Sequence, residues 1–474
     1  MLRNRLRSAS KTYDAVVCVQ GLGFVGAAMA VVVAAARRDD GTARYLVVGV
    51  DQDTESGRAR IDALGQGNFP FPNADPMIQE QLQQAVSVGN LYTTHDESVF
   101  QWADVALVDV QLDVDFSVAP PEADLGSFKR AIRTLGQHMP LGSLIIVETT
   151  VPPGTTVNVV APTLASCLQG RGLPYDAIHV AHSYERVMPG PNYFDSIAKY
   201  WRAFAGMNSA SAAACSNFLG TIIDVSNFPL TELSSPTSSE TAKILENSYR
   251  SVNIALMEEW GHFAEAIGID LFEVVQAIRV RPTHSNMRQP GLGVGGYCLT
   301  KDPYFSAIAL EKFFPKAHVD FPLTMRAMKI NEGMPQSTAI RLRELLGGDL
   351  NNKHVLVMGA SYRGDVGDTR YSPSETLTRL LMDAGANIRV HDPLAATWDL
   401  PEIPIEHEVP DPIDFDAVIF ATPHSIFRSI NLASWFGHHC PWILDSNNVL
   451  SDDQRHYLTG SNADKFVCVG RGKL

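Results

Sequence analysis

The stretch that decides the fold reads Ala15-Val16-Val17-Cys18-Val19-Gln20-Gly21-Leu22-Gly23-Phe24-Val25-Gly26. Residues 15–19 form a short apolar run that is typical of a buried strand, and residues 21–26 follow the pattern Gly-x-Gly-x-x-Gly. The alanine-rich residues 27–37 predict a helix, and a second apolar run over 45–50 ends at Asp51. This order of strand, glycine turn, helix, strand and acid predicts a dinucleotide-binding unit.

The glycines and the acid have separate roles in such a unit. Gly21 makes the turn, Gly23 leaves space for a pyrophosphate, and Gly26 lets the helix pack closely on the strand. The helix N-terminus offers N–H groups and the positive end of its dipole to the phosphates. Asp51 accepts hydrogen bonds from the adenosine ribose and repels a 2′-phosphate, so we expect NAD rather than NADP. The expected cofactor contacts are Gly21, Gly23, Phe24, Val25, Gly26 and Asp51.

The composition is that of an acidic globular protein. The chain has 474 residues, is 45% hydrophobic and carries a formal net charge of −14, so we expect several domains and no binding to nucleic acid. Residues 16–36 are mostly apolar, but their glycines argue against a membrane span. The basic start carries no secretory signal, so we expect a flexible, frayed terminus over 1–12 and a cytoplasmic protein. The six scattered cysteines predict a reduced compartment and no metal site.

Strand and helix signals alternate over residues 13–230, and again from about residue 340 without a second Gly-x-Gly-x-x-Gly pattern. A polar break over 231–240 leads into a long helix from about Ser239 to Ala266. We therefore predict an α/β fold in which a central helical region joins two Rossmann-like domains, each a doubly wound parallel sheet. The expected domains are an NAD-binding domain over 13–235, a central helical domain over 236–338 and a second Rossmann-like domain over 339–474.

The long helix has apolar residues on more than one face. They are Ile244, Leu245, Tyr249, Val252, Ile254, Ala255 and Phe263. A helix of this kind is buried on several sides, between domains or between subunits. We expect a homodimer or higher homo-oligomer built across residues 240–266, with Arg279 or Arg281 reaching into the partner's active site.

Cys298 closes a glycine-rich run, Gly291-Leu292-Gly293-Val294-Gly295-Gly296-Tyr297-Cys298-Leu299-Thr300-Lys301-Asp302. Four glycines in six residues let the backbone approach a ligand closely. A thiol after such a loop, with a lysine and a carboxylate shortly beyond it, predicts a nucleophile. The alternative is a small buried cysteine in a tight turn.

Further polar residues stand where an α/β protein binds its ligands. Lys243 and Asn247 are four residues apart on the long helix and share one face. Residues 149–154 follow a buried strand at its carboxyl end, where parallel sheets bind ligands. Glu185 and Arg186 open a third candidate segment. Taken singly, each is explained as well by a solvated helix face or an ordinary surface pair.

Together these stretches resemble the nucleotide-sugar 6-dehydrogenase family, which comprises UDP-glucose, UDP-N-acetylmannosamine and GDP-mannose dehydrogenases. The resemblance covers roughly residues 14–472. It rests on GLGFVG at 21–26, ETTVPPGTT at 148–156, YERVMPG at 184–190, ETAKILENSYRSVNIA at 240–255, GLGVGGYCLTKDPYF at 291–305, DVGDTRYSP at 365–373 and VHDP at 390–393.

The resemblance implies a role for each candidate. Cys298 resembles the catalytic nucleophile, and Lys243 and Asn247 resemble the groups that steady the oxyanion. Glu185 resembles the base that activates water, with Asp302 and Thr150 holding that water. The nucleotide sugar is then expected to bind Glu185, Arg186, Val187, Lys243, Asn247, Gly295, Arg363 and Arg370, and Thr150 is also expected beside NAD.

The implied reaction is a four-electron oxidation. The C6 alcohol of the sugar gives two hydrides to two NAD, while Cys298 holds a thiohemiacetal and then a thioester until water releases the uronate. The expected substrate is a UDP-N-acetylhexosamine, with UDP-glucose as the alternative, for polysaccharide precursor synthesis. Two other classes stay open: a two-electron hydroxyacid-type dehydrogenase, which needs no cysteine nucleophile, and a non-catalytic binding homologue.

Overall fold

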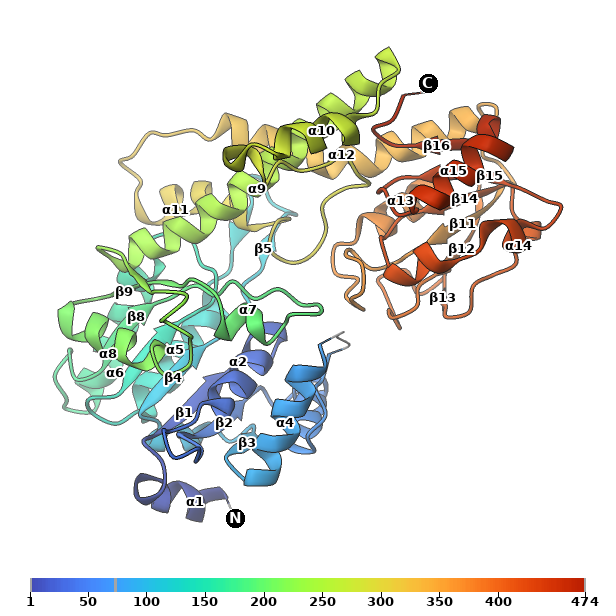
Figure 1. Cartoon of the computed structure of the whole chain (residues 1–474). Helices are drawn as coiled ribbons and strands as arrows, with labels where there is room; N and C mark the ends of the chain where they lie inside the picture. Colours follow the sequence, from blue (N-terminus) through green and yellow to red (C-terminus); the bar gives the residue numbers. More distant parts are fainter. Residues whose placement is uncertain (1, 72–74, 473–474) are drawn as a thin grey trace. The chain divides into compact units, whose positions relative to one another are not determined.

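The computed structural model describes residues 2–71 and 75–472, and the chain divides into two compact units (Figure 1). The first unit consists of Met1–Leu245 and Tyr304–Asp320, and the second of Glu246–Pro303 and Phe321–Leu474. One helix, α9 (Pro236–Ile267), contains the residue at which the first unit gives way to the second. In the described residues, no helix is both long enough and apolar enough to cross a membrane.

The first unit contains an eight-stranded sheet with the order β10-β9-β8-β7-β4-β1-β2-β3. Its strands are β1 (Ala15–Gln20), β2 (Tyr45–Val50), β3 (Leu91–Thr94), β4 (Val105–Val108), β7 (Leu144–Val147), β8 (His179–His182), β9 (Ala203–Gly206) and β10 (Thr231–Glu232). All neighbours are parallel except β8 and β9. Strands β3-β2-β1-β4-β7-β8 have the order of a doubly wound dinucleotide fold, which confirms the predicted fold class. A separate two-stranded ribbon pairs β5 (Val114–Asp115) with β6 (Glu122–Ala123).

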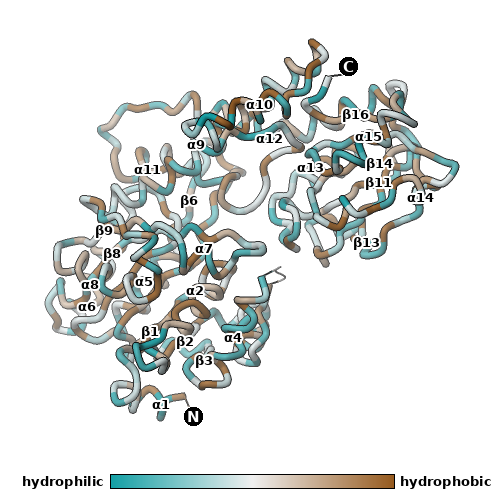
Figure 2. Tube along the Cα trace, viewed as in Figure 1, coloured by the Kyte–Doolittle hydropathy of each residue, from teal (hydrophilic) through white to brown (hydrophobic). Residues whose placement is uncertain are grey.

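Two cores form because successive strand residues face opposite sides of the sheet. Val17 and Val19 pack in one core with helices α2 (Phe24–Ala35), α4 (Pro76–Val88) and α8 (Ser209–Leu219). Val16 and Cys18 pack in the other with α5 (Gly126–His138) and α6 (Ala161–Gly170). Helix α2 is hydrophobic around its whole circumference (Figure 2), and a helix of that kind is buried on all sides. The remaining helices of this unit are α3 (Glu55–Gly65), α7 (Asp195–Ala198) and α11 (Phe305–Phe313).

The start of the chain, where the sequence predicts a flexible terminus over 1–12, contains two short helical elements. Residues Leu2–Ser8 form helix α1, followed by a short 3₁₀ turn at Ala9–Lys11. Leu6 and Ala9 are buried in the α5–α6 core. Residues three apart share a helix face, so this short segment presents both apolar side chains to the core. The basic residues around them, which suggested a solvated end, occupy the other positions.

The second unit contains a six-stranded, fully parallel sheet with the order β13-β12-β11-β14-β15-β16. Its strands are β11 (His354–Met358), β12 (Asn387–His391), β13 (Ile405–Glu406), β14 (Ala417–Phe420), β15 (Trp442–Asp445) and β16 (Phe466–Cys468). Its helices beside the second part of α9 are α10 (Leu271–Arg279), α12 (Pro322–Leu345), α13 (Pro373–Asp383), α14 (Leu432–Phe436) and α15 (Asp452–Ser461). This is again a doubly wound order, so the sequence prediction of a second Rossmann-like sheet is confirmed.

Candidate active site

The glycine turn after β1 is shaped for a phosphate. Gly21 has φ +94°, and a Cβ atom placed on it would lie 2.6 Å from the backbone oxygen of Asp109. A Cβ atom on Gly26 would lie 1.8 Å from the Gly21 oxygen, so only glycine fits there. The N-cap of α2 is Gly23, and a Cβ atom on it would meet nothing within 4 Å. Open space thus stands at the amino end of a helix, where phosphates bind.

Asp51 directly follows β2, at the position expected for the ribose-binding acid. Its Oδ2 accepts a hydrogen bond from Leu22 N at 3.3 Å, and its Oδ1 accepts one from Gln52 N at 2.8 Å. Arg60 on α3 makes an ion pair with it, with Nε 2.8 Å from Oδ2. Sequence reasoning missed Arg60, because an arginine on a mixed polar helix carries no local signal. The pair orients the carboxylate beside the glycine turn.

The other expected cofactor residues at this turn are partly engaged in packing. The ring of Phe24 stacks on Phe71 with centroids 4.0 Å apart, and the Tyr193 hydroxyl donates to the Phe24 carbonyl. Val25 packs partly buried against the core. The backbone of this first helical turn remains the part suited to a dinucleotide.

Glu185 and Lys243 meet in the first unit. Glu185 follows β8, and Lys243 stands on α9; each side chain is 9% exposed. Lys243 Nζ donates to the backbone oxygen of Glu185 at 2.9 Å and lies 3.3 Å from its Oε1. The other carboxylate oxygen accepts a hydrogen bond from Val187 N. Two residues that are 58 apart in sequence therefore form one buried ionic group.

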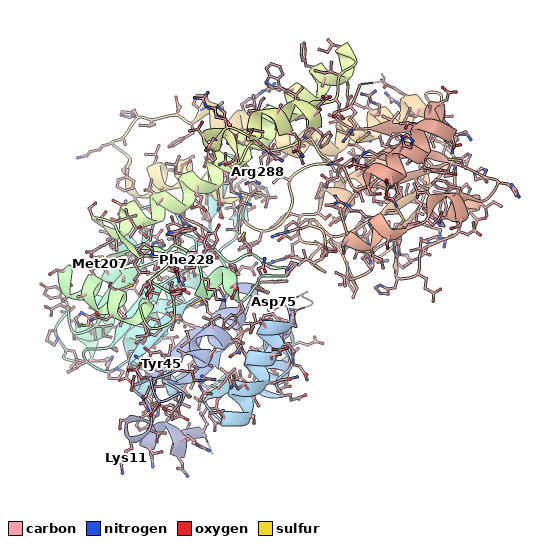
Figure 3. All side chains as sticks on the ribbon, in the orientation of Figure 1. Lys11, Tyr45, Asp75, Met207, Phe228 and Arg288 are labelled. Carbon is pink, nitrogen blue, oxygen red and sulfur yellow. The ribbon has the colours of Figure 1, made fainter. Side chains whose placement is uncertain are left out.

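The segment that carries Glu185 is anchored at both ends. Arg186 donates to the Trp201 carbonyl at 3.1 Å and to the Tyr184 hydroxyl at 3.1 Å, so its guanidinium lies along the segment itself. Further on, the backbone N–H of Phe194 donates to the carboxylate of Asp75, the N-cap of α4 that is labelled in Figure 3, at 2.8 Å.

Thr150 lies in the loop after β7, and α9 holds that loop in place. The buried carboxylate of Glu240 accepts hydrogen bonds from Gly154 N at 2.6 Å, from Thr156 N at 2.7 Å and from the Thr156 hydroxyl at 2.6 Å. Burial raises the pKa of Glu240 to about 7. Glu240 was missed in the sequence, where it reads as one more acid at the start of a helix.

A buried group of carboxylates behind the glycine turn was also missed. Glu148 is 1% exposed and is paired with Arg202. Burial raises the pKa of Asp109 and that of Glu148, and the nearby charge of Glu185 adds to both shifts. His182 lies on the adjacent strand β8, and its Nδ1 shares a hydrogen bond of 2.9 Å with the Ser239 hydroxyl. Burial, together with Lys243 and Arg202, lowers the pKa of His182 to about 3.

In the second unit, Cys298 carries an exposed thiol. Its carbonyl accepts a hydrogen bond from Asp302 N at 2.9 Å, which closes a helical turn. The fully buried Asp302 carboxylate accepts from Asn247 Nδ2 at 2.7 Å and from Lys301 Nζ at 2.8 Å. Asn247 is in turn 3.4 Å from a guanidinium nitrogen of Arg250. The structure thus joins Asn247 and Asp302, and it adds Lys301, the lysine that closely follows Cys298 in the glycine-rich run.

The expected substrate arginines lie on one loop, between β11 and α13. Arg363 is exposed, and Arg370 forms a two-pronged pair with Asp368, with Nε–Oδ1 at 2.9 Å and Nη2–Oδ2 at 2.7 Å. The Arg370 guanidinium also lies 5.4 Å from the ring centroid of Tyr297. A Cβ atom on Gly295 would collide with Tyr362 on the same loop. Asp368 therefore holds Arg370 in one orientation beside the cysteine turn.

The two arginines that were expected to reach a partner stand at and beyond the end of α10. Arg279 donates to the Met287 carbonyl at 2.8 Å, and Arg281 is exposed. Burial and the charges of Arg250 and Arg279 lower the pKa of Arg288, which is labelled in Figure 3. Arg250, Arg279 and Arg288 therefore form a cluster of positive charge, and Arg250 connects this cluster to Asn247 on α9.

Comparison with known proteins covers nearly the whole chain. Models of the UDP-glucose/GDP-mannose dehydrogenase family match as the NAD binding domain at residues 15–219, the central domain at 237–333 and the UDP binding domain at 356–452. A UDP-N-acetyl-D-mannosamine dehydrogenase of Pyrococcus horikoshii is 31% identical, over 97% of this chain and 100% of its own length. A UDP-glucose 6-dehydrogenase of Rickettsia conorii is 25% identical, over 93% and 98% respectively. The solved structure of a UDP-D-ManNAc dehydrogenase from Pyrococcus horikoshii matches with a TM-score of 0.79 at 28% identity, covering 97% of this chain and 100% of the other.

Proposed function

Because the chain belongs to the UDP-glucose/GDP-mannose dehydrogenase family, we propose that this NAD-dependent nucleotide-sugar dehydrogenase oxidises the C6 alcohol of a UDP-N-acetylhexosamine to the carboxylate. The observation that carries the proposal is the exposed Cys298 at the end of a glycine turn, in a chain that also contains a buried Lys243–Glu185 pair. A single hydride transfer needs no nucleophile, whereas two successive ones at one carbon do.

NAD is the cofactor, and the residues at the glycine turn fit it. Gly21 and Gly26 leave no room for side chains, and Asp51 lies beside them for the ribose. When bound, NAD accepts a hydride from the sugar in each of the two oxidation steps. The protein contributes the backbone N–H groups of α2 and the oriented carboxylate of Asp51.

Cys298, Lys243 and Asn247 are the residues we assign to the chemistry at the carbonyl carbon. The Cys298 thiolate adds to the C6 aldehyde, and the oxygen takes a proton to give a thiohemiacetal. Loss of the second hydride and of that proton leaves a thioester on Cys298. Lys243 and the Asn247 amide are the donors we assign to the oxygen while it carries negative charge. Asp302, which accepts from Asn247, fixes the direction of that amide.

Glu185 is the base we assign to hydrolysis. It takes a proton from water as the water adds to the thioester carbon, the C–S bond breaks, and the sulfur leaves as the thiol or thiolate. Lys243, whose Nζ lies 3.3 Å from Oε1, holds the carboxylate in place for this step. Thr150, on the loop that Glu240 anchors, is the residue we assign to holding the water and contacting NAD.

The nucleotide part of the substrate is assigned to the second sheet. Arg363 and Arg370 lie on the loop after β11, at the carboxyl edge where open parallel sheets bind ligands. Guanidiniums make paired hydrogen bonds to phosphate oxygens, so this loop suits a pyrophosphate. The ion pair with Asp368 holds the Arg370 guanidinium in one orientation, which supports this assignment.

The choice of sugar rests on the relatives. The Pyrococcus relative named for UDP-N-acetyl-D-mannosamine is 31% identical, and the Rickettsia relative named for UDP-glucose is 25% identical. This order favours an N-acetylated sugar and leaves UDP-glucose as the second candidate. Such a uronate is a precursor for polysaccharides, and we place its synthesis in the cytoplasm.

We also propose a homodimer. A line of large apolar side chains on α9, here called the α9 stripe, is exposed in the single chain. It consists of Leu245 (66% exposed), Tyr249 (51%), Leu256 (41%), Trp260 (49%), Phe263 (49%) and Ile267 (54%). The spacings of three, four and seven place these residues on one side of the helix, as at a helix–helix interface. The helix expected to be buried on several sides is thus left with an open apolar side for a second copy to cover.

The NADH yield tests the proposed function. With limiting nucleotide sugar, a four-electron oxidation yields two NADH per sugar consumed, measured by absorbance. UDP-N-acetylmannosamine, UDP-glucose and GDP-mannose form the panel, with product identified by mass. One NADH per sugar would indicate the two-electron class, and no NADH on any sugar would indicate a binding protein.

A further inference from the structure

Tyr362 packs directly against the glycine turn that leads to Cys298. It lies on the loop between β11 and α13, in the same unit as the cysteine. A Cβ atom on Gly295 would lie 2.5 Å from Tyr362 Cβ, and one on Gly296 would lie 2.8 Å from Tyr362 Cζ. Cε2 lies at 2.7 Å from the same position, so the ring edge that ends at Cζ, the atom that carries the hydroxyl, faces Gly296, two residues before Cys298.

Backbone contacts hold the ring and the turn together. The N–H of Gly296 donates to the Arg370 carbonyl at 3.0 Å, and the N–H of Tyr362 donates to the Asp368 carbonyl at 3.0 Å. The Asp368 carboxylate also accepts two hydrogen bonds from the Arg370 guanidinium. Tyr362 and Arg370 are therefore carried by one closed loop that is itself bonded to the cysteine turn.

The phenol of Tyr362 is protonated in this place. Burial, the Asp368 carboxylate and the negative charge of Cys298 as a thiolate raise the pKa of Tyr362 to about 12. The same thiolate charge acts on Arg370. The hydroxyl thus keeps its proton at neutral pH, and a protonated hydroxyl close to a thiolate stabilises the charged form of the thiol.

We propose that Tyr362 is a positioning residue for the nucleophile: its ring seats the Gly295–Gly296 turn, and its hydroxyl donates toward the Cys298 sulfur. The inference rests on the proposed function in one respect only, the assignment of Cys298 as the nucleophile. It assigns the second Rossmann-like domain a part in preparing the thiol, in addition to binding the nucleotide.

The rate of Cys298 alkylation by iodoacetamide tests the hydroxyl, because it needs no substrate. Peptide-resolved mass spectrometry separates Cys298 from the other five cysteines, and the rate is followed against pH. Tyr362→Phe keeps the ring and removes the donor. We expect the midpoint of the profile to rise and the rate at neutral pH to fall by roughly fivefold, the factor that corresponds to a hydrogen bond of about 1 kcal/mol. An unchanged midpoint overturns the role of the hydroxyl.

Two further variants distinguish the effect of the Tyr362 ring from the effect of losing any tyrosine hydroxyl in this unit. Tyr457→Phe removes a hydroxyl from a tyrosine that packs against the apolar cluster around Phe420 and Phe427, and it should leave the profile unchanged. Tyr362→Leu removes both hydroxyl and ring, so the limiting rate at high pH should change as well as the midpoint. A Leu variant that behaves like the Phe variant overturns the seating role of the ring.

Turnover distinguishes this inference from the proposed function. With nucleotide sugar as substrate, the acidic limb of the pH–rate profile should shift upward in Tyr362→Phe, as the alkylation profile does. If Cys298→Ser still forms uronate, the nucleophile assignment fails, whereas the alkylation result continues to report on the contact between Tyr362 and the thiol.

Discussion

Lys243 Nζ lies 2.9 Å from the backbone oxygen of Glu185 and 3.3 Å from its carboxylate, and both side chains are buried. A lysine that holds both the main chain and the side chain of one residue fixes that residue's rotamer. If Glu185 is the base that takes a proton from the attacking water, a fixed rotamer keeps its carboxylate in position for that step.

Glu185→Gln should stop the reaction after the second hydride. The amide keeps the shape of the side chain and can still accept from Val187 N, but it cannot take a proton from water. We expect turnover to fall by about 10²- to 10⁴-fold, the usual contribution of a general base. A burst of NADH and a sugar adduct on Cys298, detected by mass spectrometry, are the expected signs. Glu232→Gln, on the exposed β10, is the control, and steady turnover without an adduct in Glu185→Gln would contradict the assignment.

Cys298→Ser should abolish uronate formation and leave NAD binding intact. The serine hydroxyl is a far weaker nucleophile than a thiolate, and the glycine turn and Asp51 belong to the other unit. Product analysis by mass and calorimetric titration with NAD check the two halves of this statement. Cys440→Ser, at a partly buried cysteine, serves as the matched control. Normal uronate production by Cys298→Ser would rule out the covalent route.

Arg370→Ala and Asp51→Ala should affect different ligands. Loss of the Arg370 guanidinium should weaken nucleotide-sugar binding by roughly 1.5–3 kcal/mol, the range for a hydrogen bond to a charged group, with little change for NAD. Asp51→Ala should weaken NAD binding and spare the sugar nucleotide. Calorimetry of both variants with both ligands is the measurement, with the exposed Arg379→Ala on α13 as control. The domain assignment is wrong if Arg370→Ala loses NAD and keeps the sugar nucleotide.

The buried His182 should make the protein less stable in mild acid. Its folded pKa is about 3, below the ordinary 6.5, so only the unfolded chain takes up this proton as the pH falls between these values. Stability from this residue is therefore complete above about pH 6.5 and is lost progressively below it, by about 2 kcal/mol at pH 5. His182→Asn, compared with the exposed His456→Asn, should lose correspondingly less of its free energy of unfolding between neutral pH and pH 5. Equal losses in denaturant titrations of the wild type and His182→Asn would exclude this origin.

The α9 stripe should hold two copies together. We expect light scattering to give a dimer at micromolar concentration, and Trp260→Glu combined with Phe263→Glu to give a monomer, because each charge would be buried at the interface. Tyr175→Glu, at a residue that is 79% exposed elsewhere, should remain dimeric. A monomeric wild type would refute the proposed assembly.

The elements that the sequence predicted well are those with short-range causes. The glycine turn, the strand before it and Asp51 lie within 37 residues, and their pattern alone implies the fold of the first unit. The alternating strand and helix signals from about residue 340 indicated the second Rossmann-like sheet for the same reason. The burial of Leu6 and Ala9 could not be predicted, because two apolar residues among basic ones are too few to indicate that they pack in a core formed by residues much later in the chain.

The residues that were missed act through contacts that only the fold creates, in one case across a long sequence separation. Glu240 binds Gly154 and Thr156 at separations of 86 and 84 residues. Arg60 and Tyr362 acquire their roles only from what the fold brings beside them. A carboxylate on a helix or a tyrosine in a loop has no pattern of its own, so a sequence without the fold cannot distinguish these residues from surface ones.

Glu240 and Lys243 share a single helix, which has a consequence for how this chain can vary. Three residues of α-helix advance about 4.5 Å and turn about 300°, so the anchor of the Thr150 loop and the partner of Glu185 are set at a fixed phase to one another. The insertion of one residue between them would rotate Lys243 by about 100° while Glu240 stayed bonded to its loop. Along this turn of α9, a change of length would therefore break one of the two contacts even if both residues were kept, so the spacing of Glu240 and Lys243 is constrained as well as their identity.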